Sequence, residues 1–148
     1  MTHFAKAEML IRKPVTEVFE AIVNPEFTTK FWFTKSSGRL ESGKTIRWEW
    51  EMYNHHADIQ VLELELNRKL VFNWGNQEQP SMVEWTFREM KSGTFISVTN
   101  EIIQEDPEKL LAAVRDSTEG FTLVLAGLKA FLEHGIRLNL VADRFPAE

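Results

Sequence analysis

The sequence predicts an α+β fold in which a curved antiparallel sheet wraps around one long C-terminal helix. Residues 107–134 carry apolar side chains at spacings of three, four and seven, which place them along one side of an α-helix. Upstream, several short segments alternate apolar and polar residues and are separated by turn residues, as half-buried antiparallel strands are. Such a sheet cannot bury its apolar face alone, so we expect it to pack against the helix.

The chain is expected to begin with a strand followed by two short helices. The strand is predicted at Phe4–Arg12, where every second residue is apolar. Pro14 can open a helix, and the residues after it follow the helical period. Asn24 ends this helix, because a residue that precedes proline avoids the α region. The second short helix is predicted at Pro25–Phe31.

The clearest strand signal is Lys44–Met52, in which Ile46, Trp48, Trp50 and Met52 alternate with charged residues. We expect the other strands at Ser36–Leu40, Ala57–Leu66, Lys69–Trp74, Ser81–Met90 and Thr94–Ile103. The short loops between these segments favour an antiparallel meander, which gives about six or seven strands with the first one.

One predicted strand contains an irregularity. In Ala57–Leu66 the apolar residues alternate up to Val61, and the alternation then continues out of phase from Leu62. This phase change indicates a β-bulge, which would return Leu64 and Leu66 to the face of the earlier apolar residues. A strand that is buried on both faces at that point is the alternative.

The helical region near the C-terminus can be one helix or two. Asp116 can cap a second helix start, and Gly120 weakens a continuous helix by about 1 kcal/mol relative to alanine. We favour two pieces, Pro107–Val114 and Ser117–His134, with a single helix as the alternative. Gly135 ends the region in the left-handed conformation that glycine tolerates.

Composition narrows the class of protein. The 148 residues suit a single domain, 1–148, whose tail at 136–148 packs loosely as a short strand or arm. A net charge of −5 without a basic cluster argues against nucleic acid and anionic membrane surfaces. The absence of cysteine excludes disulfides, thiolate metal sites and cysteine nucleophiles. The N-terminus lacks a signal-peptide pattern, and the longest apolar run, Leu123–Leu128, is too short for membrane insertion. We therefore expect a cytoplasmic protein.

Several local motifs follow one another in an order typical of a known family. They are Ile11-Arg-Lys-Pro14, Val18-Phe19, Ala21-Ile22, Asn24-Pro25, Phe31-Trp32, Glu119-Gly120-Phe121, Leu125, Leu128-Lys-Ala-Phe-Leu-Glu133 and Gly135. With the order of elements, they resemble the START-like (SRPBCC) helix-grip superfamily. Within it, the chain is similar to the domain named after the activator of heat-shock-protein-90 ATPase, which many bacterial proteins contain alone. The resemblance extends to about Gly135, and Phe121 stands where the family commonly has tryptophan.

The resemblance implies a helix-grip fold with a cavity between the sheet and the C-terminal helix. Relatives bind lipids, sterols, polyketides or plant hormones there, and some are cyclases. The eukaryotic namesake stimulates a chaperone ATPase by protein contact. The expected partner is therefore an apolar or amphipathic small molecule, with a chaperone as the alternative, whereas the oligomeric state is not predicted.

Aromatic residues on one face of the predicted sheet are the candidates for ligand binding. The candidate residues are Trp48, Trp50, Phe72, Trp74, Trp85, Phe87, Asn100, Phe121 and Leu125. Such side chains can line a pocket or fill an ordinary core. Asn100 is a polar residue in phase with apolar neighbours, so it can hold the polar end of a ligand or pair with backbone and water.

No catalytic or metal-binding constellation is evident. Glu49 and Glu51 alternate with tryptophans and should face solvent, and His55-His56 would point to opposite faces of a strand. No glycine pattern frames a nucleophilic serine or a phosphate. We expect no catalytic residues, metal or cofactor, and a binding protein rather than an enzyme. A cyclase would need an inward-facing ionisable group, for which Lys6 and Glu8 are the candidates.

Overall fold

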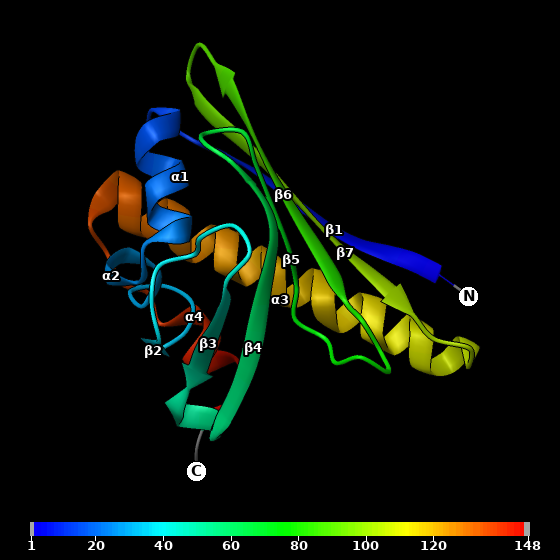
Figure 1. The fold of residues 1–148 in the computed structure, drawn as a ribbon. Coiled ribbons are helices and arrows are strands. Elements are labelled where there is room, and N and C mark those ends of the chain that lie inside the picture. The colour runs from blue at the N-terminus through cyan, green and yellow to red at the C-terminus, as the bar shows by residue number, and fades with distance from the viewer. Residues whose placement is uncertain (1, 147–148) are drawn as a thin grey trace.

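The computed structural model describes residues 2–146 and contains one antiparallel sheet with the strand order β1-β7-β6-β5-β4-β3-β2 (Figure 1). The elements are β1 (Thr2–Ile11), α1 (Val15–Val23), α2 (Pro25–Thr28), β2 (Lys35–Ser36), β3 (Thr45–Trp50), η1 (Glu51–Tyr53), β4 (His55–Glu65), β5 (Lys69–Asn73), β6 (Met82–Met90), β7 (Gly93–Ile103), α3 (Pro107–His134) and α4 (Leu140–Arg144). The predicted α+β helix-grip architecture is confirmed.

The long helix α3 lies across one face of the sheet, and α1 and α2 lie beside its C-terminal half (Figure 1). Its buried stripe includes Phe121, Leu125 and Leu128, each 4% exposed or less. Burial of one such side chain stabilises the fold by about 1.5–3 kcal/mol. At Gly127 an added Cβ would lie 3.3 Å from the Cβ of Phe31, so glycine permits a close approach between α3 and the segment after α2.

The alternation of the strands is as the sequence indicates. Trp48, Val83 and Trp85 are each 1% exposed or less. The predicted bulge is confirmed by a register shift between Val61 and Glu63. After it Leu64 is half-buried, but Leu62 lies within the bulge and Leu66 follows the last residue of β4, so both are exposed.

The C-terminal helical region is a single helix, so the favoured break at residues 115–116 is wrong. Asp106 caps this helix with a hydrogen bond to the N–H of Glu108, and Gly135 ends it with φ 65°. Gly120 sits within the helix. The intrinsic cost of glycine in a helix, about 1 kcal/mol, is smaller than the stabilisation gained by burying the apolar stripe on either side of it.

Several element boundaries differ from the predictions. Strand β3 ends at Trp50, and Met52 lies in η1 with 43% of its surface exposed, because the chain turns before the alternation runs out. Asn54 then adopts a left-handed conformation (φ 50°), and β4 begins at His55, two residues before the predicted strand Ala57–Leu66. The predicted strand Ser36–Leu40 is reduced to Lys35–Ser36, and the helix Pro25–Phe31 to Pro25–Thr28.

The tail forms the helix α4 instead of the predicted strand or arm. Its apolar residues Leu140 and Val141 are adjacent, which a pattern based on alternation cannot assign. Asn139 precedes α4 in the left-handed conformation (φ 56°) and redirects the chain. The tail thereby returns toward η1 and α3.

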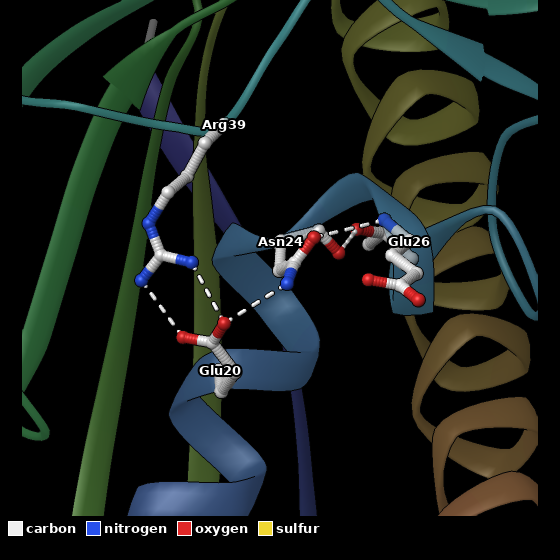
Figure 2. A network of polar contacts seen from close by, with 5 residues as sticks. Glu20, Asn24, Glu26 and Arg39 are labelled. Atoms are coloured by element: carbon white, nitrogen blue, oxygen red, sulfur yellow. Dashed lines mark hydrogen bonds and ion pairs between the residues drawn. The ribbon is translucent and has the colours of Figure 1, made fainter.

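A polar network joins α1, α2 and the segment before β3 (Figure 2). Both guanidinium Nη atoms of Arg39 donate to the Glu20 carboxylate at 2.7 Å, and the Asn24 side-chain amide donates to the same group at 2.9 Å. Asn24 also caps α2 by accepting the N–H of Glu26 at 3.0 Å. The bond from Arg39 lowers the pKa of Glu20. The ion pair is partly exposed, so it fixes geometry more than it adds stability.

A second network ties the C-terminal end of α3 to β1. The Lys129 ammonium donates to the Leu10 carbonyl at 2.7 Å and to Glu133 at 2.6 Å. The Glu133 carboxylate also accepts the backbone N–H of Arg12 at 2.9 Å. Burial acts to raise the pKa of Glu133, but the bonds from Arg12 and Lys129 outweigh it and hold this pKa below its usual value.

The packing of α3 predicts a large cost for Leu128→Ala. Leu128 is fully buried, so its truncation should lower the free energy of unfolding by about 2–5 kcal/mol. Leu111→Ala is the matched control on the same helix, since Leu111 is 66% exposed and should change stability by less than about 0.5 kcal/mol. Urea unfolding measures both. Equal effects would show that α3 does not pack by this face.

The Glu133 network predicts a pH-dependent effect of Glu133→Gln. A carboxylate whose pKa is lowered on folding stabilises the protein above its unfolded pKa, and this contribution disappears as pH falls through the folded pKa. The variant should be about 1–2 kcal/mol less stable at neutral pH. This difference should close below the ordinary glutamate pKa of 4.5. Urea unfolding across pH, with the exposed Glu8→Gln as control, measures it, and a pH-independent difference would contradict the assignment.

Candidate functional site

A cavity of about 510 Å³ lies between the middle of α3, the helix α4 and the 3-10 turn η1. Most of its surface is apolar. The aromatic residues of its lining are Trp32, Tyr53, Trp74, Phe121 and Phe145. The helix contributes Leu123 and Val124, and α4 contributes Val141. The cavity is thus placed where a helix-grip fold is expected to hold it.

Trp32 forms the boundary between this cavity and the core. Its ring centroid lies 4.8 Å from that of Trp48 and 5.6 Å from that of Trp85 on the core side. It lies 6.2 Å from Trp74 and 5.9 Å from Phe121, which line the cavity. Trp74 and Phe121 stack at 5.4 Å. These edge and stacked contacts between aromatic rings favour a rigid wall.

A continuous line of hydrogen bonds crosses the floor of the cavity. The Ser117 hydroxyl on α3 donates to Asn100 Oδ1 on β7 at 2.9 Å. Asn100 Nδ2 donates to Ser81 Oγ at 2.8 Å and to the Met82 carbonyl at 3.0 Å. The indole N–H of Trp74 donates to Ser81 Oγ at 3.2 Å. Asn100 is 3% exposed, so pairing within the protein stabilises a polar group that would otherwise be costly to bury.

Charged groups stand at the rim of the cavity. Asp116 and Glu119 project from α3, and Arg144 from α4. Arg144 donates to Glu119 through Nε and, at 3.3 Å, through Nη2. This bond to Glu119 raises the pKa of Arg144. The ion pair connects α4 to α3 across one side of the opening.

Tyr53 holds α4 on the other side. Its hydroxyl donates toward the carbonyls of Val141 and Ala142, the second at 3.1 Å. Its ring meets that of Phe145 edge-on at 6.2 Å, and the Arg144 guanidinium lies 4.4 Å from the centroid of Phe145. Helix α4 therefore covers the cavity through contacts made by a few side chains.

The structure divides the nine predicted ligand-binding residues into two groups. Three of them line the cavity: Trp74, Asn100 and Phe121. The other six are buried in the core: Trp48, Trp50, Phe72, Trp85, Phe87 and Leu125. Trp50 also borders a second hollow of about 760 Å³, together with His55, Trp32 and Trp74. The period of a strand gives the face of a side chain but not its distance from α3.

The cavity also contains residues that the sequence predictions do not include. Ser117, Gly120 and Val124 are spaced at i, i+3 and i+7 along α3, on the same face as the predicted residue Phe121, so helical periodicity in the sequence could have identified them. The place of Arg144 in the cavity could not be predicted from periodicity, because it depends on the helix α4, which the sequence did not predict.

The ionisable groups proposed for a cyclase do not face the cavity. Lys6 and Glu8 are exposed on β1 and pair with each other at 3.5 Å. Across residues 2–146, no three His, Cys, Asp or Glu side chains are grouped so that they could hold a metal ion. Over the same residues, no helix has the length and apolar character needed to cross a membrane.

One buried donor lacks a partner among the described residues. The indole N–H of Trp85 donates to no acceptor among the described residues, although the residue is 0% exposed. Its ring meets Phe121 nearly perpendicularly, at 6.0 Å and 81°. Aromatic rings are weak acceptors, so the surrounding aromatic cluster reduces the cost of this donor only in part.

Solved structures with the same fold support this description. Protein SSP2350 from Staphylococcus saprophyticus is 32% identical, with a TM-score of 0.78, and the match covers 92% of this chain and 96% of that one. The Aha1 dimer from Colwellia psychrerythraea is 17% identical with a TM-score of 0.77, covering 90% and 98%. DynU16, from the dynemicin biosynthetic locus, is 20% identical with a TM-score of 0.80, covering 90% of this chain and 48% of that one.

The two lower identities show the fold alone, and no curated protein matches this chain. The model of one protein family, however, matches residues 12–133. This match includes α1, every strand of the sheet except β1, and nearly all of α3. The fold and the family together support a ligand-binding or interaction module. The chain belongs to the family described as Activator of Hsp90 ATPase homolog 1-like protein.

Proposed function

We propose that this protein binds a hydrophobic or amphipathic small molecule in the cavity between its sheet and α3. The observation that carries the proposal is an aromatic-lined cavity of about 510 Å³ with a short line of polar groups on its floor. Ligand pockets commonly have volumes of about 300–1,000 Å³ and combine apolar walls with a few well-placed polar groups.

The local sequence keeps the cavity open at Gly120. An added Cβ at this position would meet no atom of the described residues within 4 Å, so the space beside the helix is unfilled there. About two turns further on, at Gly127, an added Cβ would lie 3.3 Å from the Cβ of Phe31. The helix therefore packs tightly at one glycine and leaves a space at the other.

A protein-interaction module that acts on a chaperone is the alternative. It would need a contiguous apolar surface. The exposed apolar side chains of the described residues include Phe4 on β1, Leu62 on β4 and Leu111 on α3, which belong to three elements that are not consecutive in the chain. A cyclase-like activity has less support still, because the ionisable groups of the cavity stand at its rim.

The variant Gly120→Leu should block ligand binding without unfolding the protein. Its side chain would occupy the open space beside α3, so the affinity for the neutral fluorescent probe Nile red should fall by more than about tenfold. Replacement of glycine within a helix should also raise the free energy of unfolding by about 0.5–1 kcal/mol. Fluorescence titration measures the affinity, and urea unfolding measures the stability.

Gly120→Ala is the matched control. It should give a similar gain in stability but retain most of the Nile red affinity, because a methyl group occupies little of the cavity. If the wild-type protein does not bind Nile red, or if Gly120→Leu binds it as well as the wild type, the cavity is not the ligand site.

A further inference from the structure

We infer that the polar end of the bound molecule donates hydrogen bonds, as an alcohol or an amine does, and is not a carboxylate or another anion. The inference rests on the proposed function and adds a chemical class of ligand to it. It follows from which hydrogen-bonding groups of the cavity are already engaged by the protein.

The orientation of the Asn100 amide is fixed by its neighbours. Nδ2 lies 3.0 Å from the Met82 carbonyl, and a carbonyl can only accept, so the amide nitrogen must face β6. The amide oxygen consequently faces α3, where it accepts the Ser117 hydroxyl at 2.9 Å. A carbonyl oxygen has two lone pairs, and among the described residues Ser117 occupies one of them. Asn100 therefore offers the cavity an acceptor.

The neutral polar groups of Ser117, Tyr53 and Trp74 also use their donors within the protein. The Ser117 hydroxyl proton is used on Asn100, so its oxygen can only accept from a ligand. The Tyr53 hydroxyl donates to the backbone of α4, and the Trp74 N–H donates to Ser81. The donors of Ser117, Tyr53 and Trp74 are satisfied within the protein, whereas lone pairs on the hydroxyl oxygens of Ser117 and Tyr53 remain able to accept.

The charges at the rim favour the same class of ligand. Asp116 and Glu119 supply two carboxylates to the lining, and Arg144 supplies one guanidinium. Arg144 is bound to Glu119 and also interacts electrostatically with Asp116, so the three groups together keep one net negative charge in the lining. Trp32 adds one neutral indole N–H, a single donor beside the acceptors of Asn100, Ser117 and Tyr53. A carboxylate would lose its hydration and meet acceptors and a like charge, which is unfavourable in a partly apolar site.

Competition against Nile red tests this inference with three ligands of equal chain length: decanol, decylamine and decanoate. At neutral pH, decanol and decylamine should displace the probe at concentrations about tenfold or more below that of decanoate. Decanol is neutral, but decanoate is repelled by the net negative charge of the protein, so the titrations are repeated at high ionic strength, where this repulsion is screened and the difference due to the cavity remains. The indole N–H signals of Trp32 and Trp74 in an NMR titration should shift and saturate if the ligand occupies this cavity.

Each outcome has one meaning. Displacement by decanoate at concentrations equal to or below those of decanol overturns the inferred class of ligand but leaves the proposed function intact. If Nile red does not bind at all, the proposed function and this inference fail together. Trp50 borders only the second hollow, whereas Trp32 and Trp74 border both, so a saturable shift of the Trp50 indole signal on addition of decanol would place the ligand in the second hollow and also overturn the inference.

Asp116→Asn tests the contribution of charge. The substitution should reduce the preference for decylamine over decanoate by roughly threefold or more, because it removes the net negative charge of the lining. Asp143→Asn is the matched control, since this substitution makes the same change in net charge. Asp143 is exposed on α4 and is not part of the lining. An equal change in both variants would show that net charge alone sets the preference and would contradict a role for Asp116.

Discussion

The structure depends on how closely α3 can approach the rest of the molecule along its length. At Gly127 the helix lies against Phe31, and the Lys129 and Glu133 network fixes its C-terminal end to β1. At Gly120 an added Cβ would meet no neighbouring atom within 4 Å, and the glycine is exposed, so this side of the helix is open. Its neighbours Ser117 and Phe121 still contact the sheet side, through Asn100 and Trp85. The cavity lies beside this open side of α3, and the tail helix α4 covers it.

The sheet was largely predictable because period-two alternation reflects burial on one face. Tryptophans at 48, 50 and 85 are buried as predicted, and the phase change near Val61 marks a real bulge. The predictions of element boundaries are wrong where the residue pattern does not match the backbone conformation. Met52 continues the pattern after the strand has ended, since η1 begins at Glu51. At Asp116 and Gly120 the local signals favour a helix break, but burial of Phe121 and Leu125 keeps the helix continuous.

The site was less predictable than the fold because it depends on contacts between distant segments. Sequence alternation places Trp48, Trp74 and Trp85 on the same face, yet Trp74 alone of the three borders the main cavity. Trp32, which follows α2, inserts between them and shields the other two. Its position depends on a short irregular segment for which no periodic pattern exists. The tail contributes Arg144 for a similar reason, since a left-handed Asn139 reverses the chain.

The polar line from Ser117 to Trp74 has a consequence for both stability and recognition. Its donors on Ser117, Asn100 and Trp74 have acceptors inside the protein, so they cause little cost when the cavity holds only water or apolar groups. The same arrangement uses up the donors and leaves acceptors facing the space. A ligand that donates a hydrogen bond gains an interaction without breaking one, whereas an acceptor must compete with bonds that already exist. The internal pairing that allows Asn100 to be buried therefore also selects what can bind beside it.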